Sequence, residues 1–597
     1  MAEQVRIATS RFGLGLLFFA WSVCAAADSE NLFARIERLN KSGATQLALR
    51  ILDSEQPPVE QIEDWLRAEQ LRFAIYRKQE AWDALTGRLD RIPAELPLIY
   101  QHRVVTHAVE SLLQSGVGTA SRKYLRDLIW RGSGDSLQVA HWRRLVIRSY
   151  LLNDFLVDAR IAMARYQKEY APTDQDWSYL YGLTLLKSGA FEQAAAQLSL
   201  VQTDGARILM WLARLRAGID DPGEVINQAE ALYAKVNKND DRQPTVLQRI
   251  WSLQAEAAAM AGNMGLRVKA LERLFSRPLR ADVEFPLKFS PEHLWQAYEE
   301  LGADAGNRQN LLVGDTESWL RRAAELRSGN MYDARAMYAL LALRSRNIEQ
   351  MDRLHGNFYD LLRGADLEFV GISLYKDPSR FSKIEQIPPS VRHRIVNYAV
   401  QKRDLGLAAA MARDLTTTYA GQSPDEWKLV RARLAIYAGE LSAGKALLYE
   451  LIRPQASLQE DTADRILQLV FDLQSVDQHA QALELFQLIL ERVRSENLQR
   501  EIHFWIGESL KDMGEYERAA ESFIRSAFYA GDDLDMWGQT ARYHAAEALA
   551  EGGMLEDAQE MYDDLLKVTT DPARAMSLER KIQDLWLRKQ GLENGDN

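Results

Sequence analysis

The stretch WIGESLKDMGEYERAAESF (505–523) decides the fold that the sequence predicts. Gly507 is followed by a turn at Gly514 and then by Ala519, and Phe523 comes one helical turn later. Two antiparallel helices joined by a tight turn can approach closely only where each presents a small side chain. A bulky residue one turn further along fills the space toward the next hairpin. The spacing therefore predicts a helical hairpin whose contact points are Gly507 and Ala519.

The same spacing recurs along the chain, which indicates an array of hairpins. It is found again in YLYGLTLLKSGAFEQAAAQLSLV (179–201), as Gly182, Gly189 and Ala194, and a third time as Ala546, Gly553, Ala558 and Tyr562. Weaker copies place a small residue at Gly444, Ala482, Ala270, Ala159, Ala409 and Ala84. Tryptophans also recur at intervals close to one repeat, at Trp142, Trp177, Trp211 and Trp251. We expect the first helix of each hairpin to bury such an aromatic side chain.

This pattern resembles that of tetratricopeptide repeats, most specifically in GEYERAAESF (514–523) and GMLEDAQEMY (553–562). The resemblance implies an all-α solenoid of about a dozen helical hairpins in two arrays. We expect an N-terminal array over 28–285, an irregular helical connector over 286–390, a C-terminal array over 391–590 and a disordered tail over 591–597.

Two segments interrupt the helical pattern. LEFVGISLY (367–375) is the best strand candidate, but it is isolated and close to three prolines, so residues 365–390 are interpreted as an irregular joint. Residues 278–314 form the second irregular zone, with a helix near 294–301. This zone is either an ordinary long connection, which the sequence favours, or a protrusion that binds a partner.

The N-terminus has the features of an export signal. Arg6 and Arg11 precede the apolar run FGLGLLFFAWSV (12–23), and Ala25 and Ala27 form a cleavage pattern. We therefore expect residues 1–27 to be a signal peptide and the mature chain to be periplasmic in a Gram-negative bacterium. An uncleaved anchor and a lipoprotein modified at Cys24 are the less favoured alternatives.

Composition excludes several classes of function. The formal net charge is −11 and no basic stretch is present, so binding to nucleic acid is not expected. No other segment is apolar enough to span a membrane. Cys24 is the only cysteine, and the nine histidines form no metal-binding motif, so neither a metal nor a cofactor is expected.

The pair Glu508-Ser509 raises the question of a catalytic acid. Lytic transglycosylases hold a catalytic Glu-Ser in a C-terminal domain, but there a glycine-rich segment and more than a hundred residues follow it. Here only 89 residues follow Glu508, and their pattern is that of two helical hairpins of the repeat type. A helix face also supplies no cleft that aligns a sugar. The sequence therefore predicts no enzyme, with a wall hydrolase as the disfavoured alternative.

The repeat register gives Glu508 another role. In tetratricopeptide proteins the groove is lined by residues of the first helix of each hairpin that lie one turn to either side of its small position and immediately after it. Carried over to this chain, the groove residues are Glu501, Phe504, Glu508, Lys511, Asp512, Thr540, Tyr543, Glu547, Glu551, Asp176, Tyr179, Leu183 and Lys187. The C-terminal part of this groove is acidic with aromatic side chains, which suits a peptide carrying Lys or Arg. The alternative is an ordinary solvated helix face.

These observations predict a non-catalytic periplasmic scaffold that binds protein partners in a cell-envelope complex for transport, secretion or cell-wall synthesis. A glycan-handling module of an exopolysaccharide or peptidoglycan pathway is the main alternative, and it predicts glycan binding by the hairpins rich in Trp and Tyr. The sequence names neither the partner nor the oligomeric state.

Overall fold

A computed structural model describes residues 32–40, 45–130, 135–236, 244–280, 282–306, 316–418, 421–475, 477–528 and 535–593. Within these ranges the chain is helical and contains no β-strand, which confirms the all-α class. None of the described helices has the length and apolar composition needed to cross a membrane. The expected signal peptide, residues 1–27, lies outside the described residues.

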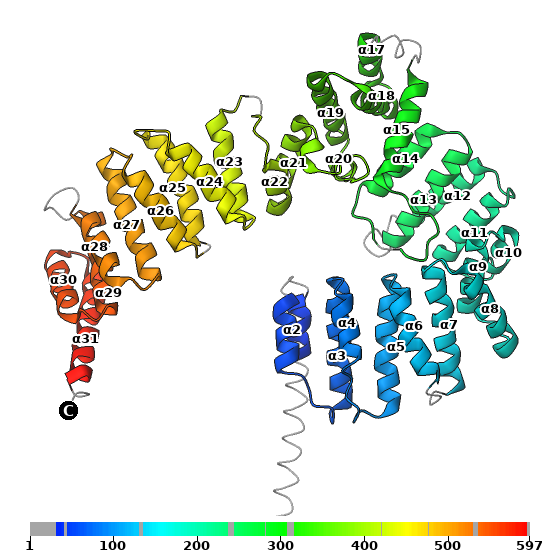
Figure 1. Cartoon of the computed structure of the whole chain (residues 1–597), viewed down its shortest axis with the longest axis horizontal. Coiled ribbons are helices and arrows are strands. Elements are labelled where there is room, and N and C mark those ends of the chain that lie inside the picture. The colour runs from blue at the N-terminus through cyan, green and yellow to red at the C-terminus, as the bar shows by residue number, and fades with distance from the viewer. Residues whose placement is uncertain are drawn as a thin grey trace, which may run out of the picture. The chain divides into compact units, whose positions relative to one another are not determined.

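The chain divides into two compact units, each built from helices that pack on their neighbours in sequence (Figure 1). The first unit reaches Arg308 and also includes Glu325–Ala336, and the second comprises Gln309–Ala324 and Met337–Asn597. Two helices are shared between the units, α17 (Thr316–Leu326) and α18 (Met331–Arg344).

The first unit contains α2 (Thr45–Ser54), α3 (Ile62–Lys78), α4 (Trp82–Leu89), α5 (Leu98–Gln114), α6 (Gly118–Trp130), α7 (Ser136–Leu152), α8 (Leu156–Tyr170), α9 (Gln175–Lys187), α10 (Phe191–Leu198), α11 (Asp204–Arg216), α12 (Pro222–Val236), α13 (Pro244–Met260), α14 (Met264–Phe275) and α15 (Pro291–Ala305). The second contains α19 (Ile348–Arg363), α20 (Glu368–Tyr375), the 3-10 helix η2 (Ile384–Gln386), α21 (Pro389–Gln401), α22 (Leu405–Ala412), α23 (Pro424–Tyr437), α24 (Leu441–Ile452), α25 (Glu460–Ser475), α26 (His479–Leu490), α27 (Glu496–Asp512), α28 (Tyr516–Ala527), α29 (Met536–Glu551), α30 (Leu555–Val568) and α31 (Pro572–Glu593).

Among the described residues, twelve hairpins close with the same turn. In each, one residue has a positive φ, and the next residue donates its backbone N–H to the carbonyl five positions earlier. This bonding satisfies carbonyl groups that the end of a helix leaves free. The left-handed residues are Glu80, Gly116, Asp154, Gly189, Gly218, Gly262, Asp366, Arg403, Gly439, Asp477, Gly514 and Gly553. We call the first helix of each hairpin its A helix and the second its B helix.

Close approach of the two helices depends on the small positions. A Cβ on Gly182 would lie 2.6 Å from Leu198 Cγ, and a Cβ on Gly507 would lie 2.7 Å from the Phe523 ring. The partners of these glycines in the B helices are fully buried, as are the equivalent residues of the third copy: Ala194, Ala519, Phe523, Ala546, Ala558 and Tyr562. The A helices also bury Trp142, Trp177 and Trp251, while Trp211 is half-buried.

The turns correct the register of three weaker copies. The small position of a B helix comes five residues after the left-handed residue, as in Ala519 after Gly514. By that count the hairpin after Glu80 uses Leu85, because Ala84 is exposed. The hairpin after Arg403 uses Ala408, which is fully buried, and Ala409 is its neighbour. Ala270 is buried but lies three positions beyond the expected place.

Replacing Gly507 with alanine is expected to destabilise the second unit by about 1–3 kcal/mol, because the added methyl group overpacks the contact with Phe523. Gly406 in α22 provides the matched control, since a Cβ there meets only Asp404 Oδ1 at 3.9 Å. Gly406→Ala should stabilise by roughly 0.5–1 kcal/mol through helix propensity. Urea unfolding of the two variants, followed by circular dichroism, should therefore give shifts of opposite sign, and equal shifts would contradict the close-contact role of Gly507.

The expected connector over 286–390 is wrong in most of its length, because regular helices occupy it. LEFVGISLY, the strand candidate, forms α20 and is the B helix of a hairpin with α19. Gly371 in α20 lies against the Tyr359 ring, where a Cβ would be 2.7 Å from Cε2, so the usual small-residue contact is present. Within 365–390, residues 365–367 form the turn of this hairpin, and residues 376–388 around η2 are irregular. The predicted helix near 294–301 is confirmed as part of α15.

The predicted C-terminal tail also needs correction. Residues 591–593 belong to the last helix, α31, and residues 594–597 lie outside the described part of the chain.

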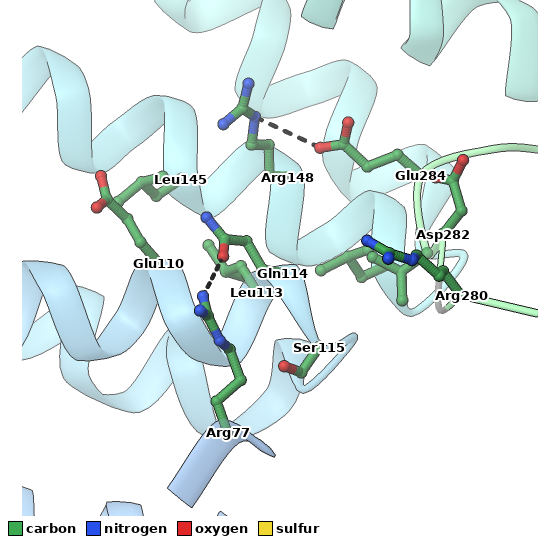
Figure 2. Close-up of a pocket in the computed structure, with 12 residues that line it drawn as sticks. Arg77, Glu110, Leu113, Gln114, Ser115, Leu145, Arg148, Arg280, Asp282 and Glu284 are labelled. Atoms are coloured by element: carbon green, nitrogen blue, oxygen red, sulfur yellow. Dashed lines mark hydrogen bonds and ion pairs between the residues drawn. The ribbon is translucent and has the colours of Figure 1, made fainter. Parts of the chain in front are cut away.

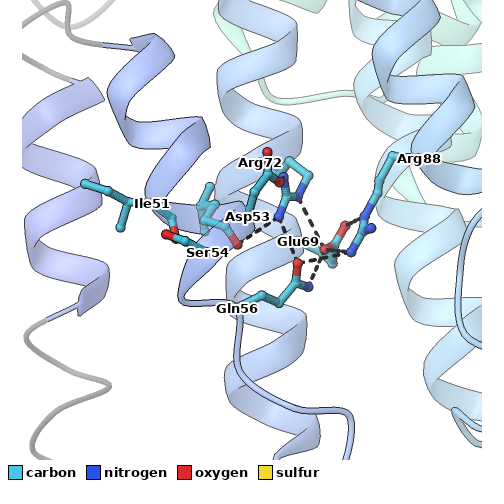
Figure 3. A network of polar contacts seen from close by, with 8 residues as sticks. Ile51, Asp53, Ser54, Gln56, Glu69, Arg72 and Arg88 are labelled. Atoms are coloured by element: carbon cyan, nitrogen blue, oxygen red, sulfur yellow. Dashed lines mark hydrogen bonds and ion pairs between the residues drawn. The ribbon is translucent and has the colours of Figure 1, made fainter.

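A buried ionic network joins the first helices of the chain (Figure 3). Glu69 and Arg72 of α3 are almost fully buried, and Arg72 pairs with Asp53 at the end of α2. Arg88 of α4 donates to both oxygens of Glu69, at 2.9 and 2.6 Å, and Gln56 donates to Glu69 at 2.7 Å. Since buried charges are tolerated only when they are paired, this network fixes how α2, α3 and α4 meet.

Candidate functional site: the groove on the A helices of the second unit

The structure brings the predicted C-terminal groove residues onto one surface. Glu501, Phe504, Glu508, Lys511 and Asp512 lie on α27, and Thr540, Tyr543, Glu547 and Glu551 lie on α29, which are A helices of adjacent hairpins. All nine side chains are half-buried or exposed. Direct contacts join the two helices, as between Lys511 and Glu547, whose Nζ and Oε2 atoms are 2.6 Å apart. We call this surface the C-terminal groove.

An aromatic cluster forms the floor of the C-terminal groove. The Phe504 ring lies 5.3 Å from each of three rings, those of Phe523, Trp537 and His544. Tyr543 of α29 in turn lies 5.6 Å from Tyr562. Such a floor offers rigid apolar area to a bound chain at little entropic cost.

A small cavity of about 240 Å³ opens beside this floor, between α29, α30 and α31. Its lining combines Thr540 and Tyr543 with apolar Leu565 and Leu578, and Arg574 of α31 donates to Thr540 at 2.9 Å. This cavity has room for one side chain of a bound peptide.

Ion pairs neutralise one of the groove carboxylates. Lys511 donates to Glu547 at 2.6 Å, and Lys581 of α31 donates to its other oxygen at 2.9 Å. Burial by itself would raise the pKa of Glu547, but the two lysines outweigh it and hold that pKa at about 2. Glu547 is therefore ionised and already satisfied.

Glu508 has the opposite environment. Burial raises its pKa, with further increases from Asp512 and Glu547, and only Lys511 opposes the shift. The Glu508 Oε1 atom is buried and accepts no hydrogen bond. His544 Nδ1 lies 3.2 Å from it, but that atom also makes no hydrogen bond, and burial lowers the pKa of His544. A carboxylate oxygen in this state gains strongly from a new donor.

The remaining predicted groove residues lie at the edges of this surface. Glu501 accepts from Trp505 Nε1 at 3.4 Å, and Asp512 lies 3.6 Å from His479 Nε2. Glu551 is exposed at the end of α29. Lys581 and Arg574 were not predicted, although Lys581 follows Glu547 by 34 residues, close to one repeat, so the register could have indicated it.

The groove residues predicted on α9 belong to the first unit and form a separate surface. Asp176 is exposed in the first turn of α9. Tyr179 donates to Glu284 at 3.3 Å, and Lys187 donates to the Leu151 carbonyl at 2.9 Å. Leu183 is only 1% exposed, so it packs in the core and offers no surface to a partner.

Two further features bear on chemistry and on glycan binding. In the described part of the chain, no group of His, Cys, Asp and Glu side chains could hold a metal ion. Trp142, Trp177 and Trp251 are at most 5% exposed and serve as packing residues, so these three side chains offer no surface to a glycan.

No protein-family model and no curated protein matches the sequence. Solved structures with similarity over most of the chain include that of the APC/C hetero-tetramer Cut9-Hcn1, with 12% identity, a TM-score of 0.28, and coverage of 93% of this chain and 96% of that one. The maize pentatricopeptide repeat protein PPR10 has 11% identity and a TM-score of 0.26, with 94% and 81% of the two chains covered. Yeast Tom70 has 12% identity and a TM-score of 0.21, with 94% and 96% covered.

The shared turn and the small-residue contacts of its hairpins identify the fold of this chain as a tetratricopeptide-like helical repeat.

Proposed function

We propose that this chain is a non-catalytic scaffold that binds protein partners, and that the C-terminal groove holds an extended or helical segment carrying Lys or Arg. The observation that carries the proposal is the buried Glu508 Oε1 atom, which accepts no hydrogen bond and lies beside an aromatic floor. A cationic side chain from a partner would pair with the Glu508 carboxylate, whose side chain is 29% exposed. Its aliphatic stem would cover the rings of Phe504 and His544.

The wider setting is part of the same proposal. The charged and apolar N-terminal run with its Ala25-x-Ala27 pattern favours export, so the partners belong to the cell envelope, in a complex for transport, secretion or cell-wall synthesis. Repeat arrays of this kind present long surfaces on which several components can be held together.

The test compares purified protein from residue 28 with its Glu508→Gln variant. The probes are labelled ten-residue peptides that are identical except for a central Lys, norleucine or Glu, and binding is followed by fluorescence anisotropy. A charge-assisted hydrogen bond contributes about 1.5–3 kcal/mol, so Glu508→Gln should weaken binding of the Lys peptides by about 10- to 100-fold. The norleucine and Glu peptides should bind weakly to both proteins.

Glu517→Gln is the matched control, because Glu517 is an exposed carboxylate on α28, the B helix of the same hairpin. This variant should bind the Lys peptides as the unchanged protein does. Equal affinity for Lys and norleucine peptides would overturn the proposal. Wall hydrolysis is tested by measuring muropeptide release by the unchanged protein and by the same Glu508→Gln variant. A wall hydrolase that uses Glu508 would release muropeptides only as the unchanged protein.

A further inference from the structure

The segment after α14 folds back onto the A helices of its own unit. Residues 282–290 are not helical, yet Phe285 and Leu287 are only 3% and 8% exposed. The segment lies beside A helices α5, α7, α9 and α13, where it forms one side of a cavity (Figure 2). We call the face that receives it the N-terminal groove.

The backbone of the segment is held at its start. Gln248 of α13 accepts from the Arg280 backbone N–H and donates to the Arg280 carbonyl oxygen, both at 3.1 Å. A side-chain amide that pairs with both backbone groups of one residue recognises extended chain whatever its sequence.

The side chains of the segment are recognised as well. Arg249 forms a two-pronged ion pair with Asp282, at 2.6 and 2.9 Å, and both side chains are almost buried. Glu284 accepts from the Tyr179 hydroxyl at 3.3 Å and lies 3.7 Å from Arg148 Nε. Bidentate pairing of Arg with a carboxylate is a specific form of recognition.

Apolar contacts complete the fit. The Arg249 guanidinium lies 5.4 Å from the centre of the Phe285 ring. Val283 lies so close to the turn between α5 and α6 that a Cβ on Gly116 would be 3.0 Å from its Cγ1 atom. An ordinary connection between helices needs none of these contacts, whereas a bound peptide makes all of them.

We propose that the N-terminal groove is a binding site for extended peptides with two alternate acidic residues followed by an aromatic one, and that Arg280 and residues 282–287 are its internal occupant. A partner segment of the same chemistry exchanges with this occupant. The proposal concerns the first unit only and is independent of the C-terminal groove.

Room for a second chain exists beside the occupant. A cavity of about 810 Å³ is lined by Arg280 and residues 282–284 together with residues of α3, α5 and α7. Three arginines line it, Arg77, Arg148 and Arg280, together with the carboxylates of Glu110, Asp282 and Glu284, and Figure 2 shows Arg148 paired with Glu284. Arg148 Nε makes an ion pair with Glu284 but no hydrogen bond. An incoming acidic peptide would compete with Glu284 for Arg148.

The internal occupant competes strongly with an added peptide because the chain links it to the groove. A segment linked at both ends competes at an effective concentration on the order of millimolar, so the unchanged protein should bind an added peptide weakly. Weakening the occupant raises the fraction of open groove and lowers the apparent Kd in proportion.

The test uses a labelled peptide with the sequence of residues 278–290 as the probe and the protein from residue 28. In an opened variant, Asp282→Asn with Glu284→Gln, the anisotropy titration should give at least about tenfold tighter binding than in the unchanged protein. A peptide with the same two substitutions should bind neither protein. Thermal melting by circular dichroism checks that the opened variant is folded.

A locked variant gives an internal control. A Cβ at residue 116 would lie 3.8 Å from the Val283 Cβ, the usual separation in a disulfide, so Gly116→Cys with Val283→Cys should form one. No other cysteine is present after residue 27. The oxidised protein should not bind the peptide, and reduction should restore binding in the same sample. Equal binding before and after reduction, or no binding by a folded opened variant, would overturn the proposal.

Discussion

Replacing Arg335 with methionine is expected to destabilise the first unit by about 3–5 kcal/mol, because the substitution leaves the carboxylate of Glu272 buried without its cation. Arg335 of α18 donates to both oxygens of Glu272 in α14, at 2.9 and 2.6 Å, and Tyr298 of α15 donates at 2.6 Å. The side chains of Arg335 and Glu272 are only 3% and 4% exposed. Burial raises the pKa of Glu272 even with Arg335 in place.

The measurement is urea unfolding combined with amide hydrogen exchange in α14 and α15, because a repeat array need not unfold in one step. Arg103→Met is the matched control. Arg103 pairs with Glu63 at 3.4 Å on the surface, where the two side chains are 54% and 71% exposed, so its loss should cost less than about 1 kcal/mol. Similar losses in both variants would contradict the buried-charge explanation.

A double variant distinguishes the loss of the ion pair from the cost of leaving one charge buried without its partner. When Arg335→Met is combined with Glu272→Leu, no buried charge remains, and most of the lost stability should return. A double variant as unstable as Arg335→Met alone would mean that packing, and not the uncompensated charge, causes the loss.

The three close copies that the sequence predicted share one property, a glycine at the turn. Gly189, Gly514 and Gly553 mark the three close copies, and glycine adopts the left-handed conformation without a steric cost. From such a turn the small positions follow by counting, as in Gly507 and Ala519. Seven of the twelve described turns contain glycine in this way.

Two of the other five turns, at Glu80 and Arg403, explain two of the errors in register. Glu80, Asp154, Asp366, Arg403 and Asp477 occupy the left-handed position, where a side chain gives no turn signal in the sequence. Without that reference point, Ala84 and Ala409 were placed one residue away from Leu85 and Ala408. For α20 the cause is different: most of its residues are buried, so no apolar period distinguishes it from a strand.

The sequence predicts which residues form the C-terminal groove, but it does not predict which of their carboxylates have shifted pKa values. Repeat register places Glu508 and Glu547 at matching positions of α27 and α29, so both were expected to be exposed carboxylates. Their pKa values move in opposite directions because Lys511 and Lys581 of α31 both donate hydrogen bonds to Glu547, whereas Glu508 accepts none from either lysine. The placement of Lys581 beside Glu547 depends on packing between repeats, and so does the placement of residues 282–287 on the first unit. Neither leaves a local pattern in the sequence.

The pH dependence of stability should show how strongly Glu547 is held. Replacing it with glutamine leaves Lys511 and Lys581 without their shared anion, and we expect this to cost the second unit about 3 kcal/mol at pH 7. That figure follows from the drop in pKa from the ordinary value of 4.5 to about 2 at a side chain that is 21% exposed. Exposed Glu579 on α31 serves as the control, and Glu579→Gln should change stability by less than about 0.5 kcal/mol.

The sign of the pH effect follows from the lowered pKa of Glu547. Between about pH 4.5 and pH 2 the unfolded chain binds a proton at this residue while the folded chain does not, so the stabilisation is lost as the pH falls through that window. Glu508 and His544 lie beside the same lysines, and Glu547 raises the pKa of each, so their titration also contributes to the difference between the unchanged protein and Glu547→Gln. Hydrogen exchange in α29 and α31 should show that difference in full at pH 7 and nearly absent at pH 2. A difference that stays constant over this range would mean that the two lysines do not stabilise the carboxylate.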